Sequence, residues 1–206
     1  MRSLLDHLPF VFPAARATVF RMSIQLYRMP AWKIRQLSGD ALFAFVNETG
    51  YLGAGAAKYI RDKADYRLDD AIKEAAPFPP ASAKLFDVKR LPVRKLIVCN
   101  LSNSQAMMTR DSVIESLCKG FEIAGDVGCQ SFVIPDPTCD WNYQTHRADP
   151  AVAANWLFAA FSRSRHRINA IKVLTTTEES FEAYKAELDR LKEVAPTIND
   201  FMQPTA

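Results

Sequence analysis

Three of the chain's seven glycines fall within six positions, at Gly50, Gly53 and Gly55, shortly after the apolar run 41–46. Residues 56–63 follow a helical pattern, so this segment is predicted to form a strand, a glycine-rich turn and a helix. Glycine lets a backbone approach a ligand closely, and the first turn of a helix offers unpaired N–H groups at the positive end of its dipole. This combination is typical of phosphate binding. The same glycines could simply form a tight turn, and the spacing alone leaves both interpretations open.

The order of these glycines argues against two common classes of nucleotide-binding protein. The turn reads GYLGAG over residues 50–55, which differs from the dinucleotide-binding fingerprint. No Gly-Lys-Ser/Thr sequence follows it, as a phosphate-binding loop of the Walker type would require. A Rossmann dehydrogenase and a P-loop ATPase are therefore disfavoured.

A second candidate loop, residues 135–149, follows the predicted strand 131–134. In open α/β sheets, ligands bind beyond the carboxyl ends of the strands, where both loops are expected to lie. The candidate ligand-contacting residues of this loop are Asp136, Thr138, Cys139, Asp140, Trp141 and Tyr143. Asp140 could act as a general base or form a turn, and the two aromatic residues could stack on a base or pack in the core. Cys139 would need a histidine partner to act as a nucleophile.

Strands and helices alternate along the rest of the chain. Strands are predicted at 23–27, 41–46, 82–88, 95–99, 131–134 and 170–174, and helices at 56–63, 66–76, 112–127, 150–163 and 177–194. Such alternation predicts an α/β layered fold with a parallel or mixed central sheet. Asp111 is the predicted cap of the helix at 112–127 and Gly128 its stop, while Val152 is predicted to face inward.

Composition limits the possible functions further. The 206 residues are 49% hydrophobic with a formal net charge of +3, which fits one folded domain (22–194) with an N-terminal extension (1–21) and a C-terminal tail (195–206). No apolar run is long enough to span a bilayer, so no membrane partner is expected, and +3 is too small to indicate nucleic acid as the main partner. The four cysteines form no C-x-x-C pair, so we expect no zinc site or other cofactor, reduced and mostly buried thiols, and a soluble, cytoplasmic protein.

One segment also resembles a known family. Asp40 and an apolar strand, then Asn47, then LGAGAA over residues 52–57, resemble the start of a macro domain. The similarity is greatest to the branch that contains the terminal ADP-ribose glycohydrolases. The order of later elements agrees over about 22–192, although only 40–60 is motif-like. The resemblance implies a three-layer α/β/α sandwich with a mixed central sheet.

The resemblance also implies an ADP-ribose cleft. In it, Asn47 would face the terminal ribose, and the backbone of Gly53, Ala54 and Gly55 would hold the diphosphate. Ala56 and Ala57 would allow the ligand to approach closely.

The function that this resemblance implies is nucleotide binding: recognition of ADP-ribose or a related nucleotide diphosphate, either free or carried on ADP-ribosylated protein or nucleic acid. One alternative is a hydrolase that removes ADP-ribose, with Asp140 and Asn47 as candidate catalytic residues. Another is a degenerate macro fold that serves as a protein-interaction module. The sequence departs from the family's pattern at three places: Arg28 stands where an adenine-binding acid is usual, loop 136–143 has no glycine, and the strand end 100–103 has no lysine.

Overall fold

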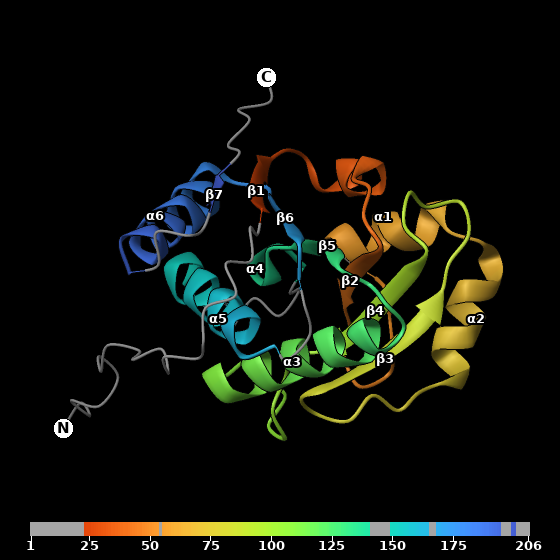
Figure 1. Ribbon diagram of the computed structural model, residues 1–206. Helices are drawn as coiled ribbons and strands as arrows, with labels where there is room; N and C mark the ends of the chain where they lie inside the picture. Colours follow the sequence, from red (N-terminus) through yellow and green to blue (C-terminus); the bar gives the residue numbers. More distant parts are fainter. Residues whose placement is uncertain (1–22, 54, 141–148, 165–167, 195–198, 201–206) are drawn as a thin grey trace.

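The computed structural model describes residues 23–53, 55–140, 149–164, 168–194 and 199–200. They form a seven-stranded sheet between two helical layers (Figure 1). The strands are β1 (Ser23–Arg28), β2 (Ala41–Phe45), β3 (Ser82–Asp87), β4 (Lys95–Asn100), β5 (Ser131–Pro135), β6 (Ala170–Thr175) and β7 (Asn199–Asp200). Their order across the sheet is β3-β4-β2-β5-β6-β1-β7.

The sheet is mixed, as predicted. β3 pairs with β4 in the antiparallel sense, and the other pairings are parallel. All five residues of β2 are buried, because helices cover both faces of the sheet. The strand is therefore apolar throughout, since a polar residue on either face would lie in a core.

Helices α3 (Arg110–Asp126), α5 (Pro150–Arg163) and α6 (Glu178–Val194) cover one face of the sheet. The 3₁₀ helix η1 (Ala31–Gln36), α1 (Gly55–Lys63) and α2 (Tyr66–Glu74) cover the other. Alternate residues of each strand point to opposite faces, so Phe43 joins the first core and Leu42 the second. The three layers match the predicted sandwich.

The cap predicted for the helix at 112–127 is wrong. Thr109 caps α3, since its side chain accepts a hydrogen bond from the Ser112 backbone N–H while the Ser112 hydroxyl accepts one from the Thr109 backbone. Asp111 lies instead in the first turn of α3. The predicted stop is confirmed, because Gly128 follows the helix with a left-handed φ of +82°.

Other details also differ from prediction. Val152 is 40% exposed and faces outward, because it lies in the first turn of α5, away from the sheet. η1 and β7 were not predicted. Among the thiols, Cys99 and Cys129 are buried as expected, whereas Cys118 is half-buried; all three are free. Within the described ranges, no helix is long and apolar enough to cross a bilayer.

Candidate functional site

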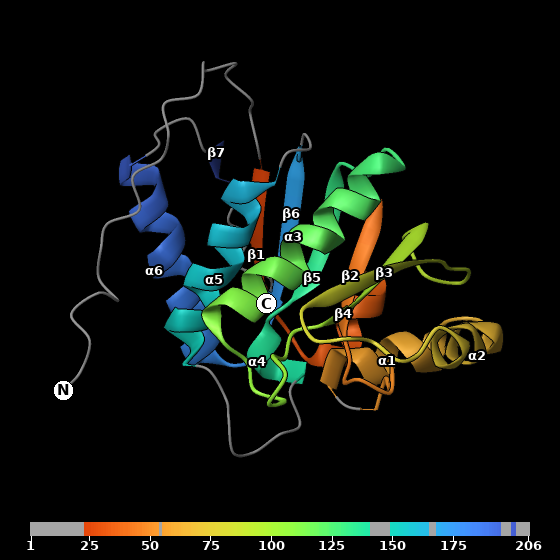
Figure 2. The ribbon, with the colours of Figure 1, turned by 90° about the horizontal axis from the view of Figure 1, so that it is seen from below.

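The two predicted loops meet at one edge of the sheet. β2 and β5 are parallel neighbours, so the loop after β2 (residues 46–54) and the short helix α4 (Pro137–Asp140) after β5 leave from the same edge. α1, which follows the first loop, contacts α4, and Figure 2 shows them near each other. This is the edge at which open α/β sheets bind ligands.

Asn47 holds the β2–α1 loop in shape. Its Oδ1 accepts hydrogen bonds from Thr49 N at 3.1 Å, Thr49 Oγ1 at 2.7 Å and Tyr51 N at 3.3 Å. The Asn47 backbone oxygen accepts a further bond from Gly50 N at 3.0 Å. Its Nδ2 group donates to no described residue, so the side chain can organise the loop and still offer a donor to a ligand.

The three glycines of this segment are each explained by a different local feature. Gly50 has a φ of +75°, and a Cβ there would lie 2.8 Å from Cε2 of buried Phe78, so both conformation and packing require glycine. Gly53 lies against the exposed Tyr51 ring, which an added Cβ would overlap. Gly55 begins α1 with a φ of +52°. Ala54 lies outside the described residues.

The start of α1 packs tightly on the sheet. Ala56 and Ala57 are buried in the second core, so their methyl groups face the protein interior. Small side chains here bring the first turn of α1 close to β2 and its neighbours. Any contact of these two residues with a ligand would therefore involve their backbone.

Asp136 is fully buried at the end of β5. Its Oδ1 accepts hydrogen bonds from Thr138 N at 2.9 Å and the Tyr184 hydroxyl at 3.3 Å, and its Oδ2 accepts one from Thr138 Oγ1 at 2.6 Å. The carboxylate thus holds the start of α4 and ties it to α6. A ligand could reach α4 at the partly exposed Thr138 but not at Asp136 without a rearrangement.

The remaining candidates of the second loop cannot be placed further. Cys139 and Asp140 lie in α4, but their side chains are outside the described part of the structure. Trp141 and Tyr143 belong to the segment 141–148, which is also outside it.

A pocket of about 230 Å³ lies beside Asn47, between the β2–α1 loop and the segment that follows β4. Its lining residues are Asn47, Glu48, Thr49, Pro80, Asn100, Ser102, Asn103, Ser104 and Ala106. Asparagines shape its far wall. Asn100 Nδ2 donates to the Phe78 carbonyl at 2.8 Å and its Oδ1 accepts from Ser102 N and Oγ, while Asn103 Oδ1 accepts from the backbone of residues 105 and 107.

Sequence reasoning missed this pocket. The segment 100–107 carries no glycine, charge or histidine, and its Asn-Leu-Ser-Asn start is the signal that was available. Among the described residues that line the pocket, Glu48 is the one with an ionisable side chain, and its carboxylate forms no hydrogen bond or ion pair with the described residues. A second pocket, of about 300 Å³, lies between α2 and the end of β3, away from both loops.

Three further features bear on the chemistry. Arg28, at the end of β1, forms an ion pair with Glu178, so a cation and its partner occupy the place where the resemblance leads one to expect a free acid.

Among the described residues, no cluster of three or more potential metal ligands occurs. Burial raises the pKa of the Cys99 thiol to about 12, despite its opposing hydrogen bond to Ser116, so this cysteine is not a nucleophile.

No protein-family model matches the sequence, and no curated protein matches it. Solved structures do match. An Oceanobacillus iheyensis macrodomain variant with ADP-ribose aligns with a TM-score of 0.68 at 15% identity, covering 82% of this chain and 92% of that one.

Two other structures agree closely. The Oceanobacillus iheyensis macrodomain with ADP gives a TM-score of 0.67 at 16% identity, over 79% of this chain and 89% of that one. The Trypanosoma brucei macrodomain in complex with ADP-ribose gives a TM-score of 0.68 at 15% identity, over 80% of this chain and 68% of that one. The chain therefore has the macrodomain fold, in a strongly diverged sequence.

Proposed function

We propose that this protein binds ADP-ribose or a related nucleoside diphosphate at the carboxyl edge of β2 and β5. The observation that supports this most is the position of the β2–α1 loop. The glycine-containing turn lies at the carboxyl edge of the sheet, next to a second loop, and similar structures of this fold were solved with ADP-ribose and ADP. The backbone of residues 53–57 is the proposed diphosphate site.

The pocket beside Asn47 extends this site in the direction of β4. We place the terminal ribose at its mouth, where the Nδ2 group of Asn47 can donate to a ribose hydroxyl. The asparagine and serine side chains of the pocket offer neutral polar groups, which match sugar hydroxyls better than phosphate. A group attached to the ribose, such as a modified side chain or base, would then enter the pocket itself.

Calorimetric titration with ADP-ribose tests this proposal. We expect saturable binding by the wild-type chain, and a loss of binding in Gly53→Val, because a branched side chain would displace Tyr51 and fill the proposed diphosphate site. Gly128→Ala is the matched control, since Gly128 has open space around it and follows α3. Absence of heat with the wild-type chain, or unchanged affinity in Gly53→Val, would contradict the proposal.

A second candidate function is hydrolysis of an ADP-ribosyl bond. It is favoured by the carboxylate of Glu48, which lines the pocket and forms no hydrogen bond or ion pair with the described residues. In this proposal Glu48 removes a proton from water, whose oxygen attacks the anomeric carbon of the terminal ribose. The bond from that carbon to the acceptor breaks, and the proton passes to the departing acceptor.

Release of free ADP-ribose from ADP-ribosylated protein or DNA would test this activity. Glu48→Gln and Asp140→Ala should be compared in the same assay, because the sequence singled out Asp140 and the pocket singles out Glu48. Loss of release in Glu48→Gln alone supports Glu48 as the base. Unchanged release in Glu48→Gln refutes that role.

A further inference from the structure

Exposed aromatic rings lie beside basic side chains on η1 and on the neighbouring β2–α1 segment. Trp32 of η1 is 36% exposed, and both Lys33 Nζ and Arg35 Cζ lie over its ring, at 5.9 and 5.5 Å from the ring centroid. Tyr51 is 58% exposed, with Arg61 Cζ at 5.9 Å. An exposed ring beside a cation offers a flat face on which a base can stack and a charge that a phosphate can contact.

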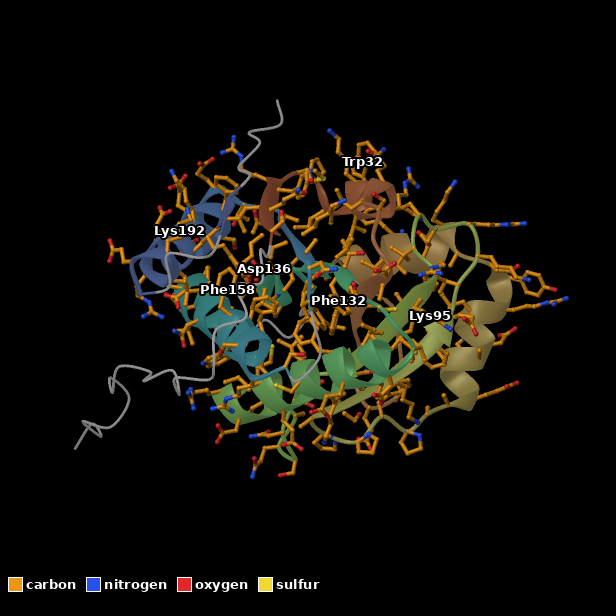
Figure 3. All side chains as sticks on the ribbon, in the orientation of Figure 1. Trp32, Lys95, Phe132, Asp136, Phe158 and Lys192 are labelled. Carbon is orange, nitrogen blue, oxygen red and sulfur yellow. The ribbon has the colours of Figure 1, made fainter. Side chains whose placement is uncertain are left out.

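These residues belong to neighbouring elements. η1 packs against α1, and Arg61 of α1 reaches the ring of Tyr51 in the β2–α1 loop. Lys58 of α1 lies over Tyr59 at 5.3 Å in the same way. Figure 3 shows Trp32 at the outer rim of the molecule. We call this set, Trp32, Lys33, Arg35, Tyr51, Lys58 and Arg61, the basic aromatic surface.

Positive charge is concentrated here. η1 and α1 together carry five basic residues and one acidic residue, Asp62, whereas the whole chain has a net charge of only +3. Asp62 pairs with Lys58 and Arg61. Lys33 and Arg35 have no acidic partner among the described residues, so they are available to an anion.

We propose that the basic aromatic surface binds single-stranded nucleic acid. Cations that contact phosphates and rings on which bases stack are the two features that such binding requires. An acidic protein partner would satisfy the cations but would have no need of the exposed rings. The surface borders the β2–α1 loop at Tyr51, so a bound strand would pass beside the proposed nucleotide site. Binding of the strand itself does not depend on ADP-ribose.

Fluorescence anisotropy with a labelled oligothymidine of about 20 nucleotides tests the proposal in low salt. We expect Trp32→Ala and Arg35→Glu each to weaken binding about tenfold, through lost stacking and lost phosphate contact respectively. If all four cations of the basic aromatic surface contact phosphates, the logarithm of the dissociation constant should change by about 2.8 per tenfold change in salt. Arg35→Glu should lower that slope by about 0.7.

Two control variants match these changes elsewhere. Lys185→Glu on α6 alters the net charge as much as Arg35→Glu does, and Val127→Ala trims an apolar side chain that is 52% exposed at the end of α3. Both should bind the oligonucleotide within about twofold of the wild-type chain. Circular dichroism and thermal melting of each variant check that it is folded.

The proposal is overturned if the wild-type chain does not bind the oligonucleotide, or if the control variants weaken binding as much as the surface variants do. Binding of an acidic polypeptide but not of the oligonucleotide would likewise overturn it in favour of a protein partner. ADP-ribose titration of the same variants is an independent measurement. A wild-type chain that binds the oligonucleotide but not ADP-ribose would count against the proposed function and not against this surface.

Discussion

Replacing Gly50 by alanine should destabilise the protein through two effects that can be separated. The first is conformational, because the φ of +75° lies in the left-handed region, where an L side chain costs roughly 1–2 kcal/mol. The second is steric, because the new Cβ would lie 2.8 Å from Cε2 of Phe78 and 3.0 Å from Cγ2 of Ile72, both buried. Overpacking of this kind costs roughly 1–3 kcal/mol. We therefore expect Gly50→Ala to lower the free energy of unfolding by about 2–5 kcal/mol.

Gly128→Ala isolates the first effect. Gly128 has a similar φ of +82°, but no atom lies within 4 Å of the added Cβ, so only the conformational cost applies. Urea denaturation of both variants gives the comparison, and the difference between them should be about 1–3 kcal/mol. Phe78→Leu in the Gly50→Ala background should recover part of the loss by making room for the methyl group. Equal destabilisation by the two glycine substitutions would refute the packing of the β2–α1 loop against Phe78.

Three further predictions concern the core and the ionisable groups. Gly120→Ala should destabilise the protein by roughly 1–3 kcal/mol in urea denaturation, since its Cβ would lie 2.7 Å from Cε1 of Phe43; an unchanged midpoint would contradict the contact between α3 and β2. At Asp40, burial opposes ionisation, but hydrogen bonds from the backbone and hydroxyl of residues 130–131 outweigh it and lower the pKa. A lowered pKa in the folded state stabilises the protein above the unfolded pKa of about 4, and the stabilisation is lost as pH falls through the folded value. Asp40→Asn should therefore lower the free energy of unfolding by about 2 kcal/mol at neutral pH and by progressively less in acid. Urea denaturation at neutral and at acidic pH measures this difference. An equal loss at both pH values would show that the Asp40 carboxylate is not the source of the stabilisation. In a Cys139→Ser background, Cys99 should not react with a thiol reagent until the protein unfolds, because its pKa is about 12; its alkylation in the folded state, seen by mass spectrometry, would contradict its burial.

Much of the fold was predictable because both faces of the sheet are covered. β2 and β5 were recognised as short, continuous apolar runs, and α3 by its stripe of buried residues. The N-cap of α3 could not be identified from the sequence, because Thr and Asp are both favoured N-cap residues. Only the reciprocal hydrogen bonds between Thr109 and Ser112 decide between Thr109 and Asp111. η1 and β7 are too short for a periodic pattern, and β7 depends on pairing with β1.

The candidate site was predictable only in part, because strand order is a tertiary property. Alternation of strands and helices indicated two ligand-facing loops, but the pairing of β2 with β5 is what brings them together. The burial of Asp136 depends on Tyr184, which comes from a distant helix. The pocket beside Asn47 was missed because Asn100 and Asn103, which shape one of its walls, bond to backbone groups in a pattern with no distinctive spacing.

The concentration of charge could not be foreseen from the total. A net charge of +3 argued against nucleic acid as a partner, yet five basic residues lie on η1 and α1, which the fold packs together. Total charge averages over surfaces that the fold separates.

Amide chemical-shift mapping by NMR during titration with ADP-ribose tests the central claim most directly. We predict saturable shifts that cluster at residues 47–57 and 136–138, with smaller shifts at 100–106 where the pocket adjoins Asn47. Residues that line the pocket between α2 and β3, such as Leu68 and Phe86, should not shift. Shifts centred on α2 and β3, or no shifts at all, would contradict the placement of a nucleotide site at the carboxyl edge of β2 and β5.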